Sequence, residues 1–153
     1  MSWTLLTFDH KPASWLEDRL AMYLKRLNHW IDVEHKIITP SGLSQLQQAK
    51  QLDWEKFQHH KILSKKTLVV FDENGSLMTS DKLSKLVAQW ELQRDVCFVV
   101  GPSYGLSPLW RDHATSCLSL SNLTLTHEFA QLLVTEQLFR AFTILKGLPY
   151  HIA

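Results

Sequence analysis

Short apolar runs alternate with segments of helical periodicity along all 153 residues of the chain. The runs 67–71 (TLVVF) and 96–100 (VCFVV) are typical of strands that are covered on both faces. The segments between the runs carry apolar residues every three or four positions, as helices with one buried face do. This alternation predicts an α/β fold, a mostly parallel sheet with helices on both faces.

The predicted elements follow one another closely, and the chain length suits one domain with a sizeable core. We therefore expect a single domain over residues 1–153. The expected strands are 3–8, 33–38, 67–71, 96–100 and 117–120, with a turn at 72–75 and a loop at 121–126. The expected helices are 12–27, 43–63, 80–93 (capped by Thr79 or Ser80), a short one from Ser107-Pro108, and 127–146.

Charge and hydropathy exclude several classes of protein. The net charge of +1 carries no overall basic signal for nucleic acid. No apolar run approaches the roughly 20 residues of a membrane-spanning helix, and the first residues lack the features of a signal peptide. These features predict a soluble cytoplasmic protein.

Cysteine and histidine usage predicts neither a disulfide nor a metal site. Cys97 and Cys117 lie in or beside apolar strand-like runs, where a free thiol behaves as a small buried hydrophobic group. His59 and His60 are adjacent, so they would diverge on a helix surface rather than share one metal ion.

The last predicted helix, 127–146, is apolar on nearly every face. A helix of this kind is buried on almost all sides, and one small domain rarely covers it completely. This pattern favours a homodimer with a two-fold interface. The alternative is a central core helix in a monomer. The apolar residues are Phe129, Leu132, Leu133, Val134, Leu138, Phe139, Ala141, Phe142, Ile144 and Leu145.

Three loops follow predicted strands of the parallel sheet. In such sheets, ligands bind outside the carboxyl ends of the strands. The loops are Phe71-Asp72, Gly101–Gly105 and Leu120–Thr126. The GPSYG segment lacks the lysine of a phosphate-binding loop, which argues against a nucleotide triphosphatase.

Five segments occur in a fixed order: FDENG, FVVGPSYGLS, LSLSNLTLTH, EQLFRAFTILKG and the final PYH. With WLEDRLAMYLKRL near the start, they make the chain resemble, over essentially its full length, the SPOUT-class methyltransferases of the large subunit methyltransferase H family. That family methylates N3 of a pseudouridine in 23S ribosomal RNA. The resemblance implies a C-terminal trefoil knot over approximately residues 67–153, S-adenosyl-L-methionine as cofactor, and an active site completed across a homodimer.

The resemblance also implies which residues form the site. His127 and His151 suit proton transfer, Arg140 suits stabilisation of an anion or a phosphate, and Tyr150 suits stacking or hydroxyl donation. Backbone groups of the loops would hold the cofactor. The implied cofactor-binding residues are Phe71, Gly101, Pro102, Gly105, Leu120, Ser121, Asn122, Leu123, Thr124 and Leu125.

Each implied catalytic residue has a structural alternative. His127 can help to start the last helix, and Arg140 can pair with Glu136 four residues earlier. Tyr150 and His151 lie at the chain end, where disorder is common.

Four positions depart from the family pattern: Pro102, Thr126, Gln131 and Ile152. Pro102 removes a backbone donor, while Gln131 and Ile152 replace usual basic residues near the expected RNA surface. The departures motivate an alternative, a non-catalytic homologue that binds cofactor or ribosome without methyl transfer. A third hypothesis is a small-ligand or RNA-binding module with an unrelated βα arrangement.

Overall fold

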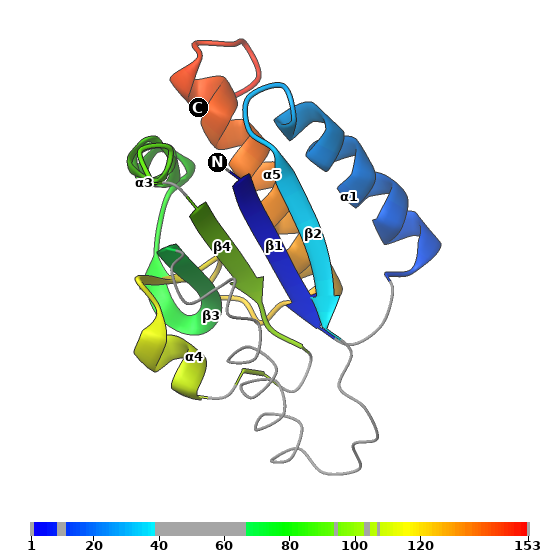
Figure 1. Ribbon diagram of the computed structural model, residues 1–153, viewed down its shortest axis with the longest axis vertical. Coiled ribbons are helices and arrows are strands. Elements are labelled where there is room, and N and C mark those ends of the chain that lie inside the picture. Colours follow the sequence, from blue (N-terminus) through cyan, green and yellow to red (C-terminus); the bar gives the residue numbers. More distant parts are fainter. Residues whose placement is uncertain are drawn as a thin grey trace.

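The computed structural model describes residues 2–8, 12–38, 67–93, 95–102, 105–106 and 108–152. Its strands form one parallel sheet in the order β2-β1-β4-β3-β5 (Figure 1). The strands are β1 (Ser2–Phe8), β2 (Val33–Ile38), β3 (Thr67–Leu77), β4 (Asp95–Val100) and β5 (Ser116–Ser119). The helices are α1 (Ser14–Leu27), α3 (Ser80–Trp90), α4 (Pro108–His113) and α5 (His127–Leu145). The expected helix 43–63 lies outside the described residues.

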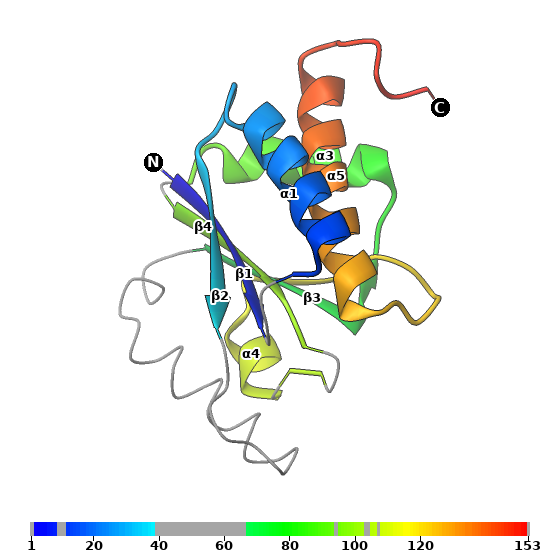
Figure 2. The same cartoon turned by 90° about the vertical axis from the view of Figure 1, so that its right-hand side faces the viewer.

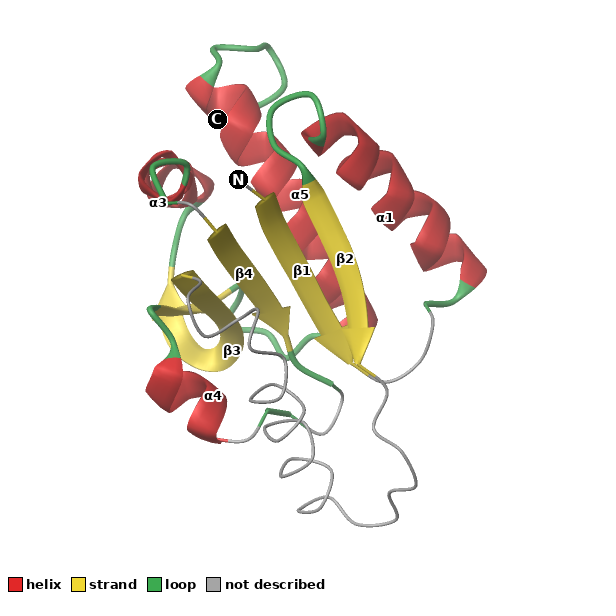
Figure 3. Ribbon diagram, in the orientation of Figure 1, coloured by secondary structure: helices red, strands yellow, loops and turns green. Residues whose placement is uncertain are grey.

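Helices cover both faces of the sheet, as predicted. Helices α1, α3 and α5 lie on one face and α4 on the other (Figures 2 and 3). The larger core lies under the three helices, where Trp3 contacts the rings of Phe98 and Phe142. The smaller core lies under α4, where Phe8 packs edge-on against Trp110. The prediction of an α/β fold is therefore confirmed.

Helix α5 is the central helix of the larger core. It packs between α1 and α3, and Val134, Leu138 and Phe142 are fully covered. This burial explains much of its apolar sequence within one chain. Phe129 is nevertheless 54% exposed, and Leu145 is exposed too. The homodimer stays a prediction.

The third strand differs from the expectation that it ends at Phe71. β3 continues to Leu77, and both Phe71 and Ser76 pair with Leu118 of β5, so residues 72–75 form a bulge rather than a terminating turn. A Cβ atom on Gly75 would lie 2.6 Å from the carbonyl carbon of Leu118, so glycine permits this close approach. Turn-forming residues occur in bulges as well as in turns, which is why the sequence predicted the wrong end.

Side-chain hydroxyls cap two of the helices at their first turn. Thr79 accepts a hydrogen bond from the backbone N–H of Lys82 at 3.1 Å, so it is the cap of α3, as one of the two predicted candidates. Thr126 accepts from the backbone N–H of Phe129 at 3.3 Å and caps α5. Among the helices in the described part of the chain, none has the length and hydrophobicity to span a membrane.

Candidate functional site

A cleft of about 670 Å³ opens beside the bulge of β3 and at the carboxyl ends of β4 and β5. The structure brings together there the three loops that the sequence singled out. A volume of this size suits a small organic ligand. The cleft is lined by Phe71, Asp72, Glu73, Val100, Gly101, Pro102, Gly105, Leu106, Ser119, Leu120, Ser121, Leu123, Thr124, Leu125, Thr126, His127, Glu128 and Ala130. All the predicted cofactor-binding residues except Asn122 are among them.

A tight turn after β4 forms one wall of the cleft. The N–H of Gly105 donates to the carbonyl oxygen of Pro102 at 2.9 Å, and Gly105 has a φ of 80°, in the left-handed region. Pro102 is buried, and its carbonyl closes the turn. The proline thus fits the turn although it brings no N–H of its own.

The loop after β5 forms the opposite wall and is held by its own side chains. The N–H of Leu123 donates to Oγ of Ser121 at 2.9 Å, and Oγ of Ser119 donates to the carbonyl oxygen of Ser121 at 3.0 Å. Oγ1 of Thr124 reaches Oε2 of Glu73 at 3.5 Å, which links this loop to the bulge of β3. The cleft is therefore bounded by loops whose shape depends on local hydrogen bonds.

Sequence reasoning missed the acidic character of the cleft. Asp72, Glu73 and Glu128 all line it, and Arg111 lies 4.0 Å from Asp72 as a long ion pair. The signal was present, because the two acidic residues of FDENG directly follow a buried strand, but we interpreted them as turn residues. Three carboxylates in one cleft favour a ligand that carries positive charge.

His127 is the predicted catalytic residue that lies in the cleft. It is the first residue of α5, and its Nε2 atom is 3.8 Å from Oε1 of Glu128. The alternative role, starting the helix, is filled by the neighbouring Thr126. His127 is thereby available to a ligand in the cleft.

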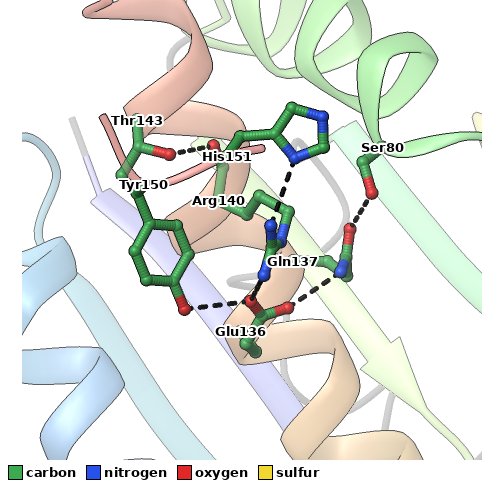
Figure 4. A network of polar contacts seen from close by, with 7 residues as sticks. All are labelled: Ser80, Glu136, Gln137, Arg140, Thr143, Tyr150 and His151. Carbon is green, nitrogen blue, oxygen red and sulfur yellow. Dashed lines mark hydrogen bonds and ion pairs between the residues drawn. The ribbon is translucent and has the colours of Figure 1, made fainter. Parts of the chain in front are cut away.

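Arg140, Tyr150 and His151 do not line the cleft; they form a polar network at the other end of α5 (Figure 4). Oε1 of Glu136 accepts from Nε and Nη2 of Arg140 at 3.0 and 2.8 Å and from the hydroxyl of Tyr150 at 3.1 Å. Nη1 of Arg140 lies 3.1 Å from Nδ1 of His151. The expected alternative for Arg140, an ion pair with Glu136, is thus present.

The pKa values of both Arg140 and Tyr150 are raised in the network. The hydrogen bond from Arg140 to Glu136 raises the pKa of the guanidinium, which therefore stays charged. Burial, followed by the hydrogen bond with Tyr23 and the charge of Glu136, raises the pKa of Tyr150 to about 12. Tyr150 is consequently a neutral phenol whose hydroxyl donates a hydrogen bond to the carboxylate of Glu136.

The cleft and the network are well separated within one chain. Arg140 comes thirteen positions after His127 on α5, and at about 1.5 Å per residue this is about 20 Å of helix. In Figure 2, the loop that leads into α5 and the C-terminal segment lie at opposite ends of that helix. The four predicted catalytic residues therefore divide into one at the cleft and three far from it.

One of the departures from the family pattern, Gln131, is not where the sequence placed it. Gln131 is 4% exposed and belongs to the buried side of α5, so it is not an RNA-facing surface position. Ile152 is 92% exposed at the chain end.

Within the described ranges, no group of three or more His, Cys, Asp or Glu side chains gathers as a metal site would require.

Comparison with known proteins identifies related sequences. A family model described as "Predicted SPOUT methyltransferase" matches residues 1–151. A protein of Dechloromonas aromatica named ribosomal RNA large subunit methyltransferase H is 34% identical, over 99% of this chain and 98% of its own length. A protein with the same name from Herminiimonas arsenicoxydans is 32% identical, over 99% of this chain and 99% of its own length. Another from a Synechococcus strain is 36% identical, over 96% of this chain and 92% of its own length.

Solved structures share the fold at low sequence identity. A probable methylase family protein from Haemophilus influenzae superposes with a TM-score of 0.58 at 12% identity, over 99% of this chain and 70% of that one. TrmJ from Z. mobilis gives a TM-score of 0.54 at 15% identity, over 94% of this chain and 70% of the other. These similarities support the α/β fold of the chain.

Proposed function

The chain belongs to the SPOUT methyltransferase family, and from that premise we propose that it transfers a methyl group from S-adenosyl-L-methionine to N3 of a pseudouridine in 23S ribosomal RNA. The observation that carries the proposal is the cleft at the strand ends, because loops, apolar side chains and carboxylates meet there. The relatives named as ribosomal RNA large subunit methyltransferases match nearly the whole chain, which supports the same substrate here.

The residues of the cleft fit S-adenosylmethionine. Phe71, Val100 and Leu106 offer an apolar wall for an adenine ring, while the loops offer backbone groups for its polar edge. Asp72, Glu73 and Glu128 suit the two positive charges of the cofactor, the sulfonium and the ammonium. Asn122 lies outside the cleft lining and is not part of this set.

The chemistry requires alignment and removal of one proton. When bound, S-adenosylmethionine supplies an activated methyl group, so the protein contributes positioning and a site that excludes water. N3 of the base must lose its proton as its lone pair attacks. His127 is at the cleft and is suited to accept that proton, and Arg140 is suited to stabilise the negative charge that develops on the base.

A homodimer would bring the cleft of one chain together with the polar network of the other. Arg140, Tyr150 and His151 are about 20 Å of helix away from His127 in the same chain, so the network of a second chain is better placed to complete the cleft. Trp15 and Phe129, 46% and 54% exposed and in mutual contact, offer an apolar surface for the second copy beside the cleft. The trefoil knot, the single domain over 1–153 with its cofactor-binding part at 67–153, and the cytoplasmic location belong to the same proposal.

Mass mapping of 23S ribosomal RNA tests the proposal. Ribosomes from a strain that lacks the protein are expected to miss one methyl group on a pseudouridine, and purified protein with S-adenosylmethionine is expected to restore it. Ribosomes that carry uridine in place of the pseudouridine serve as the control. An unchanged methylation pattern in the deletion strain refutes the proposal, and cofactor binding without turnover indicates the non-catalytic homologue instead.

A further inference from the structure

We propose that Glu136 is a positioning residue, whose carboxylate sets the orientation of Arg140 and Tyr150 and, through Arg140, that of His151. The inference rests on the proposed function, since it assigns Glu136 a role in the same methyl transfer. Glu136 itself touches neither cofactor nor base in this proposal, and it acts through the three side chains that it holds.

One oxygen of Glu136 is the common acceptor of the network. Its Oε1 atom receives Nε and Nη2 of Arg140 at 3.0 and 2.8 Å and the Tyr150 hydroxyl at 3.1 Å. Its Oε2 atom receives Nε2 of Gln137 at 2.8 Å. The side chain is only 18% exposed, so water competes weakly for these donors. Figure 4 shows the carboxylate between the arginine and the phenol.

The orientation of His151 follows from that of Arg140. A guanidinium has donors alone, so the 3.1 Å contact with Nδ1 of His151 requires an unprotonated Nδ1. The other ring nitrogen, Nε2, lies 3.8 Å from Oδ1 of Asp81. By holding Arg140, Glu136 therefore also fixes the donor that faces Nδ1 of His151.

Contacts that do not involve the Glu136 carboxylate also hold this segment. The ring of Tyr150 packs edge-on against Phe139 with centroids 4.8 Å apart, and Cζ of Arg140 lies 4.8 Å from the centre of the Tyr150 ring. Gln137 connects this region to α3 through a 2.7 Å bond from Ser80. Removal of the carboxylate leaves these contacts in place, so we expect such a variant to fold.

Two substitutions separate positioning from folding. Glu136→Met keeps the length of the side chain and removes both acceptor oxygens, whereas Glu136→Gln keeps one. We expect Glu136→Met to lower kcat for methyl transfer about 100-fold, as misplacement by about an ångström does, with unchanged cofactor affinity and only a small fall in melting temperature from the donors left without their acceptor. Glu136→Gln should recover part of that loss. Glu34→Met is the matched control, since Glu34 is 64% exposed on β2.

A double variant tests whether the effect passes through Arg140. Glu136→Met combined with Arg140→Ala should be no slower than Arg140→Ala alone, because residues that act as a unit are not additive. Wild-type kcat in Glu136→Met overturns the proposal. A fall in kcat accompanied by equal losses of cofactor affinity and thermal stability also overturns it, because it indicates a structural role only.

Ultraviolet titration of the tyrosines gives a readout that does not depend on activity. Burial and the hydrogen bond with Tyr23 raise the pKa of Tyr150 most, and Glu136 adds to the rise, so the phenol should ionise at lower pH in Glu136→Met than in the wild type. Tyr150→Phe identifies which phase of the titration belongs to Tyr150. An unshifted phase refutes the positioning role even if methylation is observed, whereas an inactive wild-type protein refutes the proposed function and leaves this measurement interpretable.

Discussion

The two ends of α5 are built in different ways. At its N-terminal end, loops define a cleft, and hydrogen bonds of the backbone and of short hydroxyl side chains hold those loops in shape. At its C-terminal end, long polar side chains bond directly to one another around Glu136. The first arrangement tolerates changes of side chain provided that the loop shape survives, whereas the second depends on the identity of each residue.

The departures from the family pattern illustrate this difference. Pro102 and Thr126 both lie at the cleft end, and each has a local role there, since Pro102 closes a turn with Gly105 and Thr126 caps α5. At the network end, Arg140 and Tyr150 match the family motifs FRAF and PYH. Under the proposed function, affinity for the cofactor would belong mainly to the cleft end, and turnover would depend on the network end as well as on His127.

Removal of the chain beyond Pro149 is expected to have the largest effect, because it should lower the rate of methyl transfer and leave cofactor binding unchanged. Loss of Tyr150 and His151 should lower methyl transfer by about 1000-fold or more, because two positioned groups disappear together. The cofactor affinity, measured by calorimetry, should be the same as in the full chain. The oligomeric state, measured by sedimentation, should also be unchanged. Full activity of the truncated protein would show that the C-terminal segment has no part in catalysis.

Removing a negative charge from the cleft should lower the affinity for the cofactor rather than the rate of methyl transfer, and the effect should be smaller than that of the truncation. Glu73→Gln or Glu128→Gln should each weaken S-adenosylmethionine binding by about fivefold, the effect of roughly 1 kcal/mol for a partly exposed charge. S-adenosylhomocysteine, which lacks the sulfonium charge, is the matched ligand and should lose less affinity. Equal losses for the two ligands would contradict an electrostatic role for these carboxylates.

The smallest effect concerns stability in alkaline solution. Tyr150 has a pKa of about 12 in the folded protein against 10.0 for an unperturbed tyrosine. Between these values the unfolded chain binds fewer protons than the folded one, so stability falls as the pH rises from 10 to 12. Chemical denaturation at several pH values should show this slope in the wild type and a shallower one in Tyr150→Phe. Equal pH dependence of stability in the two proteins would show that the Tyr150 hydroxyl does not bond to Glu136 in solution.

Much of the fold was predictable, because periodicity and caps are local properties of the chain. The strands at 33–38 and 96–100, the helix predicted at 12–27 and observed from Ser14 to Leu27, and the cap at Thr79 follow from residues within a few positions of each other. The end of β3 was not predictable in this way. Its bulge depends on Leu118, more than forty residues further along the chain, which pairs with both Phe71 and Ser76.

The sequence by itself determined the alternation of strands and helices, the three loops at the strand ends and the order of the family motifs, since each is written in consecutive residues. The tertiary structure decided how the chemically interesting side chains divide. It placed His127 in an acidic cleft and gathered Arg140, Tyr150 and His151 around Glu136 at the far end of the same helix. That division depends on where α5 lies against the sheet and on the path of the chain after it, and both follow from contacts between residues that are distant in the sequence.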